Sequence, residues 1–169
     1  MPIIKNLLQA WNIPILQVDG YEADDVIGTL ATKAGTMGIN TYMLTPDKDY
    51  GQLVTDHVFI FRPRHGGGYE TMGVEEVKAK YSIPSTAAVI DLLALMGDSA
   101  DNFPGCPGVG EKTAVKLINE FGTVEQMLSR SSEIKGALRT KIEEHVDDIK
   151  MSKFLATIKT DVPIELNIR

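Results

Sequence analysis

The chain has 169 residues, of which 43% are hydrophobic and 24% charged, so it is long enough for one folded domain with a buried core. It contains no apolar run of about 18 residues, which excludes a membrane span, and its first residues lack a signal-peptide pattern. The net charge of −6 argues against nucleic-acid binding through overall charge, unless bound metal neutralises some acids. The single cysteine, Cys106, agrees with a reducing compartment, and we expect a cytoplasmic protein.

The first half of the chain alternates predicted helices and strands. Apolar residues at helical spacing predict helices over residues 3–11 and 23–37. Apolar and alternating runs predict strands, which are residues 15–18, 41–44, 58–62 and 69–71, with Gly66, Gly67 and Gly68 closing a hairpin between the last two. The order strand, helix, strand favours a parallel βαβ unit.

The second half is predicted to be almost entirely helical. The predicted helices are residues 74–81, 85–96, 112–121, 124–128 and 135–158, the last with a break. Thr123 and Gln126 have the spacing of a capping box, which indicates a helix start. We therefore predict an α/β part over residues 1–72 and a helical part over residues 73–169, packed as one unit.

Seven carboxylates lie in three short clusters. They are Glu22, Asp24 and Asp25, then Asp47 and Asp49, then Asp98 and Asp101. Asp and Glu oxygens are the ligands that hard divalent ions prefer, whereas the three histidines are scattered and show no zinc spacing. Two Mg²⁺ or Mn²⁺ ions about 3.5–4 Å apart activate water and neutralise phosphate charge in phosphodiester hydrolysis. The clusters therefore favour a two-metal site.

Local geometry allows each cluster to present its carboxylates together. Glu22 and Asp25 are three residues apart at a helix start. We expect an extended segment to point Asp47 and Asp49 to one side. Two carboxylates at 4 Å repel by about 4 kcal/mol at an effective dielectric of 20, so convergence of the clusters requires cations or altered protonation.

Each cluster alone also has a simpler explanation. Acidic residues in a first helical turn stabilise the helix dipole, so the residues around Asp24 suit a cap. Asp47 and Asp49 suit a turn after Pro46, and Asp98 and Asp101 suit a solvated loop. Three such clusters, each at the end of an element, favour the metal site over three separate caps.

A glycine-rich segment follows the last acid cluster. Gly108 and Gly110 precede a predicted helix, in a pattern that resembles the hairpin of a helix-hairpin-helix. We expect the glycines to allow positive φ and the backbone N–H groups at the helix start to face a phosphate. Lys112, Thr113 and Lys116 would add contacts to the DNA backbone without reading base identity. An ordinary tight turn is the alternative, and Cys106 suits a packing residue there.

Four stretches together resemble one family. They are GYEADDVIGTLA, LTPDKDYGQLV, ALMGDSADNFPG and GVGEKTAVKLI, in that order along the chain. The chain resembles the flap endonuclease family, and within it the 5′→3′ exonuclease domains of bacterial DNA polymerases I.

The resemblance implies a two-metal site on an α/β core and a helix-three-turn-helix that holds duplex DNA. The seven carboxylates would be the catalytic and metal-binding residues, and the hairpin residues would hold the DNA backbone. It further implies cleavage of 5′ flaps, nicks or 5′ ends, a K⁺ ion near the hairpin, and an attached polymerase region in the full-length protein. The family's first strand, its upstream acids and its basic helical arch have no counterpart in this sequence.

Two other functions remain open from the sequence. A non-catalytic helix-hairpin-helix module would bind DNA through the hairpin without cleaving it, and an incomplete set of acids would make this fragment inactive. A small α/β binding protein would use its acidic residues only as helix caps.

Overall fold

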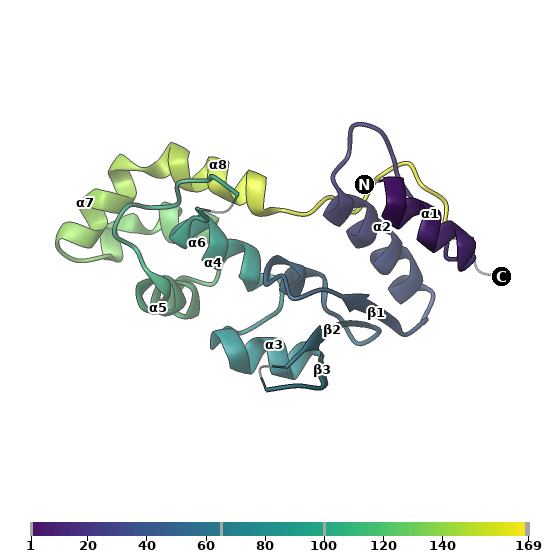
Figure 1. Cartoon of the computed structure of the whole chain (residues 1–169). Coiled ribbons are helices and arrows are strands. Elements are labelled where there is room, and N and C mark those ends of the chain that lie inside the picture. Colours follow the sequence, from purple (N-terminus) through teal and green to yellow (C-terminus); the bar gives the residue numbers. More distant parts are fainter. Residues whose placement is uncertain (1, 65, 100, 168–169) are drawn as a thin grey trace.

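The computed structural model of the protein describes residues 2–64, 66–99 and 101–167. The elements are α1 (Pro2–Ala10), α2 (Ala23–Thr36), β1 (Thr41–Leu44), η1 (Asp49–Leu53), β2 (Val58–Pro63), β3 (Tyr69–Met72), α3 (Val74–Tyr81), α4 (Ala88–Met96), α5 (Glu111–Phe121), α6 (Val124–Ser129), η2 (Ser131–Glu133), α7 (Ala137–Glu144) and α8 (Val146–Ala156), where η marks a 3-10 helix. Figure 1 shows the sheet and α2 beside a cluster of helices formed by α5 to α8. The predicted α/β class with a helical second part is confirmed.

The sheet has the order β1-β2-β3. β1 runs parallel to β2, with Thr41 opposite Val58, and β2 runs antiparallel to β3, with Ile60 opposite Met72. The predicted hairpin is therefore confirmed. Side chains alternate across the sheet, so Val58, Ile60 and Met72 are buried in the core, whereas the ring of Tyr42 stacks on Phe59 on the other face.

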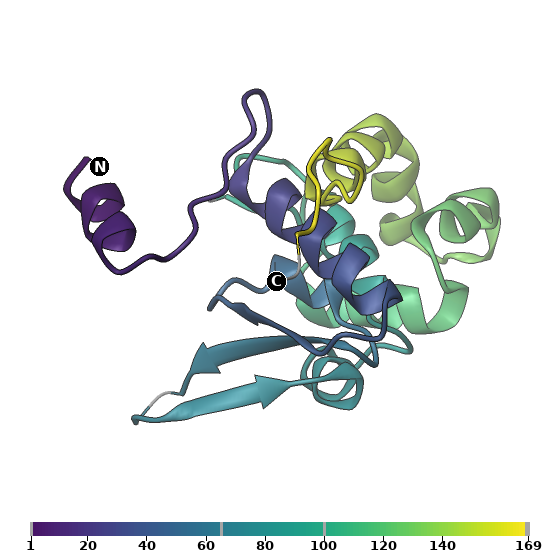
Figure 2. The same ribbon diagram turned by 90° about the vertical axis from the view of Figure 1, so that its right-hand side faces the viewer.

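The strand predicted over residues 15–18 is wrong. Residues 13–18 form an irregular segment, and Leu16 is 56% exposed. A strand needs a hydrogen-bonded neighbour, and within the described residues β1 pairs with β2 alone. Figure 2 shows α1 and this segment extending away from the sheet. The parallel pairing that we expected across α2 is formed instead by β1 and β2, which are joined through η1.

Two helix predictions differ from the structure in detail. The helix predicted from residue 85 begins at Ala88, because residues 84–87 form a turn in which the Thr86 hydroxyl donates to the Val54 carbonyl at 3.0 Å. The break predicted within residues 135–158 lies at His145, between α7 and α8. Within the described residues, no helix combines the length and the apolar character that a bilayer crossing requires.

The core continues from the sheet into the helical part through α4. Leu92, Leu93 and Leu95 on α4 are buried, and the helix packs against η1, α5 and α8. The chain after α8 returns along α2, where the Thr29 hydroxyl accepts a hydrogen bond from the Val162 N–H at 3.1 Å (Figure 1). The predicted boundary at residue 72 stays a prediction.

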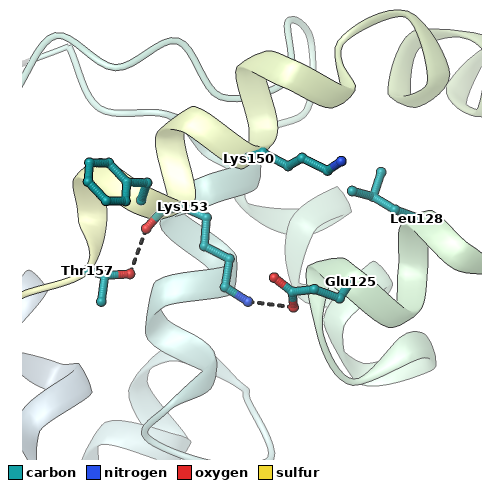
Figure 3. A pocket seen from close by; sticks show the side chains of 6 residues that line it. Glu125, Leu128, Lys150, Lys153 and Thr157 are labelled. Carbon is teal, nitrogen blue, oxygen red and sulfur yellow. Dashed lines mark hydrogen bonds and ion pairs between the residues drawn. The ribbon is translucent and has the colours of Figure 1, made fainter.

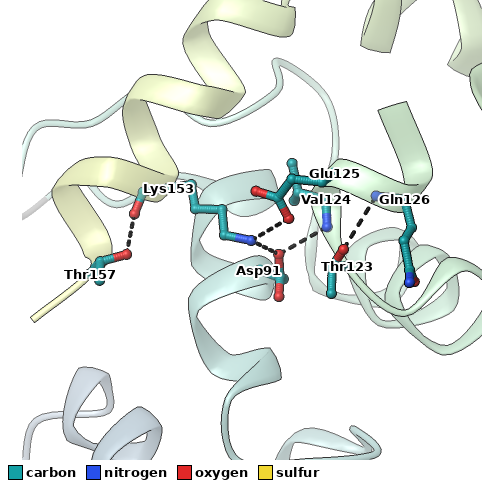
Figure 4. A network of polar contacts seen from close by, with 7 residues as sticks. All are labelled: Asp91, Thr123, Val124, Glu125, Gln126, Lys153 and Thr157. Atoms are coloured by element: carbon teal, nitrogen blue, oxygen red, sulfur yellow. Dashed lines mark hydrogen bonds and ion pairs between the residues drawn. The ribbon is translucent and has the colours of Figure 1, made fainter. Parts of the chain in front are cut away.

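A polar network around the buried Asp91 joins three helices of the second part (Figure 4). Oδ1 of Asp91 accepts hydrogen bonds from the Val124 N–H at 2.9 Å and from the Lys153 ammonium at 2.6 Å. Lys153 also donates to Glu125 at 2.7 Å. The Thr123 hydroxyl accepts from the Gln126 N–H at 3.2 Å, so the predicted helix start at Thr123 is confirmed. Asp91 thus connects α4 with α6 and α8.

Candidate metal centre and nucleic-acid hairpin

Asp47 lies in the turn between β1 and η1, and Asp49 is the first residue of η1. Lys48 has helical backbone angles (φ −70°, ψ −27°), and Oδ1 of Asp47 accepts the Asp49 N–H at 3.0 Å. The extended segment expected here is therefore wrong, because the Asp47 side chain folds the backbone into a turn. Asp47 is exposed, whereas Asp49 is half-buried at the start of η1.

Asp49 has a buried oxygen that suits a cation. Its Oδ1 is inaccessible to solvent and has no hydrogen-bond partner among the described residues. The pKa of Asp49 is raised to about 6, mainly by burial and also by the charges of Asp47, Asp101 and Asp98, against the lowering effect of Lys48. An unpaired buried carboxylate oxygen is unfavourable, and a bound divalent ion would satisfy it.

Asp98 and Asp101 are held in a short loop after α4. The backbone N–H and carbonyl of Asp98 each bond to Phe103 at 3.0 Å, which closes the loop around Asp101. The Asp98 side chain is 9% exposed and forms an ion pair with the Lys48 ammonium. This pair connects the loop after α4 with the turn after β1.

A close backbone crossing fixes the position of this loop. Gly105 has φ +63°, and a Cβ there would lie 2.2 Å from the backbone nitrogen of Gly97. A side chain does not fit at Gly105 without moving the segment that leads into Asp98. The Gly105 N–H donates to the buried Ser152 hydroxyl at 2.8 Å, so α8 also anchors this crossing.

The acids of α2 have different surroundings from one another. Glu22 is the exposed N-cap residue, and its side chain forms no capping hydrogen bond within the described part of the chain. Oδ1 of Asp24, in the first turn of α2, accepts the N–H of the next residue, Asp25, at 3.1 Å. Oδ1 of Asp25 accepts the Lys159 N–H at 2.9 Å and so holds the C-terminal segment against α2.

The pKa of Tyr50 is affected by acids of both α2 and the turn after β1. Burial raises the pKa of Tyr50 to about 12, and the charges of Asp24, Asp47 and Asp49 contribute to this rise. Asp24 and the acids of the turn therefore act on the same hydroxyl group.

The structure thus brings part of the predicted acid set together. The acids that share electrostatic surroundings are Asp24, Asp47, Asp49, Asp98 and Asp101. Within residues 2–64, 66–99 and 101–167, no three acidic, histidine or cysteine side chains are close enough to form a ready metal cage. The carboxylates form an open group, in which Lys48 of the turn after β1 pairs with Asp98.

The glycine hairpin directly precedes α5. Gly108 has φ +80°, as expected, but Gly110 has an extended backbone (φ −91°, ψ 178°) as the N-cap of α5, so the expectation of positive φ is wrong for Gly110. A Cβ on Gly110 would meet no atom within 4 Å in the described part of the structure, which leaves that side open to a ligand. Cys106 is buried, and burial raises the pKa of its thiol, in keeping with a packing residue.

Basic and polar side chains surround the helix start. Lys112 and Lys116 are exposed on α5, and Thr113 is partly buried. The first N–H groups of a helix have no acceptor within the helix. In α5 the Thr113 N–H donates to the carbonyl of the N-cap Gly110 at 3.0 Å, so the two N–H groups before it are the ones placed to face an anion. This arrangement suits a phosphate group.

Several residues of the site were not found by the sequence reasoning. Lys141 on α7 has its ammonium 2.7 Å from the point where a Gly108 Cβ would lie, although no local pattern connects the two. Gln52 donates to the Ala156 carbonyl at 2.9 Å and accepts from the Ile158 N–H at 3.0 Å, which fixes η1 against the chain after α8. Gln52 lies within the LTPDKDYGQLV stretch, so its position beside the acids was the available signal.

A further cavity lies between α6 and α8 (Figure 3). Its volume is about 550 Å³, and its lining residues are Glu125, Leu128, Lys150, Lys153, Phe154 and Thr157. None of the predicted acids or hairpin residues lines this cavity, so it is distinct from the candidate site.

Family models match almost the whole chain. The N-terminal resolvase-like domain of 5′-3′ exonucleases matches residues 1–82, and the C-terminal SAM fold of 5′-3′ exonucleases matches residues 84–169. The chain belongs to the 5′-3′ exonuclease family. The resemblance inferred from the four sequence stretches is thereby confirmed.

Relatives of this member of the 5′-3′ exonuclease family include bacterial DNA polymerases I. It is 46% identical over 170 residues to DNA polymerase I of Bacillus subtilis (strain 168), and 41% identical over 168 residues to the thermostable DNA polymerase I of Thermus aquaticus. Each alignment covers 99% of this chain but only 19% and 20% of the respective relative. The chain therefore spans about a fifth of the length of these relatives.

Solved structures share the fold. T5 5′-exonuclease with bound divalent metal ions (zinc) has a TM-score of 0.81 at 22% identity, over 94% of this chain and 59% of that one. The catalytic core of Rad2 in complex with DNA substrate has a TM-score of 0.58 at 18% identity, over 99% of this chain and 59% of that one. These likenesses confirm the fold of the exonuclease family.

Proposed function

We propose that this chain is part of a structure-specific 5′→3′ nuclease that hydrolyses DNA phosphodiester bonds with divalent metal ions. The buried Oδ1 of Asp49, which has no hydrogen-bond partner in the part of the chain that the structure describes and is affected by the charges of Asp47, Asp98 and Asp101, carries the proposal, because it suits a bound cation. Membership of the exonuclease family and the metal-bound and DNA-bound neighbours support it. Carboxylate ligands favour Mg²⁺ or Mn²⁺.

Seven carboxylates are the proposed metal ligands and catalytic residues, namely Glu22, Asp24, Asp25, Asp47, Asp49, Asp98 and Asp101. Divalent ions at such a site supply water activation and neutralise phosphate charge. The ion pair of Lys48 with Asp98 holds two of the contributing segments together. Gln52 bonds to the end of α8 and so holds η1 in place. Ser152 on α8 accepts the Gly105 N–H and so holds the segment next to the Asp98 loop.

The hairpin is the proposed DNA-backbone site. Gly108, Gly110, Lys112, Thr113 and Lys116 would hold phosphates of a 5′-flap, nicked or 5′-ended duplex, with a K⁺ ion nearby by family resemblance. Contacts of this kind position the duplex without reading its sequence. We further propose that the full-length protein has an attached polymerase region and that it is cytoplasmic.

A non-catalytic DNA-binding module is the second candidate. The hairpin and α5 are fully formed, whereas the described carboxylates form no ready metal cage. Such a module would bind duplex DNA equally well with and without divalent metal and would not cleave it.

Cleavage of a labelled 5′-flap duplex in Mg²⁺ and in Mn²⁺ separates the two candidates. The nuclease proposal predicts products that disappear with a chelator and in Asp98→Ala. Tight duplex binding without products in either metal would support the non-catalytic module for this chain.

A further inference from the structure

Lys48 places a positive charge inside the group of proposed metal ligands. Its side chain is 42% exposed, yet its ammonium pairs with the nearly buried carboxylate of Asp98. It also lies between Asp47 and Asp49 in the sequence, inside the group of carboxylates. A cation at this place is unexpected if the carboxylates only bind metal.

We propose that Lys48 is an internal counter-ion of the acid group, which stabilises the metal-free protein and is displaced from Asp98 by a divalent ion. This inference rests on the proposed function. It assigns Lys48 as a positioning residue that sets the affinity for metal.

The charges of the group support this assignment. The charges of Asp47, Asp98 and Asp101 each repel that of Asp49, and repulsion of this kind is stronger where a side chain is shielded from water. The Lys48 ammonium carries the opposite charge and pairs directly with the nearly buried carboxylate of Asp98. The ammonium thus reduces the repulsion within the group.

A divalent ion and the ammonium would compete for the same carboxylate. An ion that contacts both the unpaired Oδ1 of Asp49 and the carboxylate of Asp98 would repel the ammonium of Lys48. There is room for the displaced side chain, because Lys48 also lines a cavity of about 250 Å³ beside Lys80 and Glu111. Removing the Lys48 charge should therefore raise the affinity for metal and lower the stability of the metal-free protein.

The experiment compares Lys48→Met with the matched control Lys80→Met, which removes a charge from the same cavity without touching Asp98. Mn²⁺ affinity is measured by calorimetry, and thermal unfolding is measured in chelator. We expect Lys48→Met to bind Mn²⁺ about tenfold more tightly and its metal-free Tm to fall by about 2–4 °C, while Lys80→Met changes neither. Lys48→Arg keeps the charge and should retain the wild-type Tm.

Three results would overturn the inference. They are unchanged or weaker Mn²⁺ binding by Lys48→Met, an unchanged metal-free Tm in that variant, and equal effects in Lys80→Met. Mn²⁺ binding by neither the wild type nor Lys48→Met would contradict the proposed metal-dependent function as well, so the two failures are distinguishable.

Discussion

The ammonium of Lys153 lies 2.6 Å from Oδ1 of Asp91, and this contact joins α8 to α4 in the interior of the helical part. Only 7% of the Asp91 side chain is exposed, and the same oxygen accepts the Val124 N–H at the start of α6. One carboxylate therefore holds α8 and α6 in position relative to α4, which leads into the loop of Asp98.

Asp91→Ala should lower the free energy of unfolding by about 3 kcal/mol, because it leaves a buried N–H and a partly buried ammonium without their acceptor. Glu125→Ala removes the more exposed partner of Lys153 and should cost less than about 1 kcal/mol. Urea denaturation of both variants measures the difference. Equal losses would contradict the role of Asp91 as the buried centre of the network.

Gly105→Ala should destabilise the protein by about 3 kcal/mol or more, because the new Cβ meets backbone at a positive φ. Gly110→Ala is the matched control, since φ is −91° there and the space is open. It should change stability by no more than about 0.5 kcal/mol. If the hairpin contacts DNA phosphates, Gly110→Ala should nevertheless weaken duplex binding, as measured by fluorescence anisotropy.

Lys112→Ala, Lys116→Ala and Lys141→Ala should each weaken duplex binding at low salt and reduce the slope of log affinity against log salt by about 1. Lys141 belongs in this set because its ammonium lies beside Gly108. Lys150→Ala on α8 is a control of equal charge at the separate cavity shown in Figure 3. A salt slope that falls equally in the control would show that only the overall charge matters.

Asp49 should make the stability of the metal-free protein depend on pH. Its pKa rises from the usual 3.8 to about 6 on folding, so the folded state holds the proton more tightly than the unfolded state. The ionised carboxylate therefore opposes folding above pH 6, and the effect disappears as the pH falls toward 4. Asp49→Asn should stabilise the protein at pH 7.5 by about 1 kcal/mol, after allowance for partial solvent exposure, and by nothing near pH 4.

Urea denaturation of Asp49→Asn at the two pH values, with the exposed Asp56→Asn as control, measures this effect. The same stabilisation at both pH values would show that Asp49 keeps its usual pKa in the folded protein.

Local patterns predicted most of the fold. The strand over residues 41–44 and the helix over residues 74–81 coincide with β1 and α3. The first is a short apolar run followed by Pro46, and the second has apolar residues at helical spacing after Gly73. The strand over residues 15–18 was wrong because an apolar run forms a strand only beside a partner, and the pattern of one segment contains no information about its neighbour.

The candidate site was predicted less completely. The sequence identified the acids and the hairpin, since clustered carboxylates and a glycine pair are visible locally. It did not reveal that Lys48 pairs with Asp98 or that Lys141 approaches Gly108, because these contacts depend on how distant elements pack. The expectation of an extended Asp47–Asp49 segment was wrong because the Asp47 side chain bonds to the backbone and forms a turn.

If acids from three separate segments share one metal site, a single bound ion must lie near all three. Titration of the ¹⁵N-labelled protein with Mn²⁺, followed by NMR, detects this because the paramagnetic ion broadens only nearby amide signals. We expect the signals of Asp24, Asp49 and Asp98 to broaden together at the same Mn²⁺ concentration, while that of Leu138 on α7 remains sharp. Broadening confined to one segment, or at unrelated positions, would contradict it.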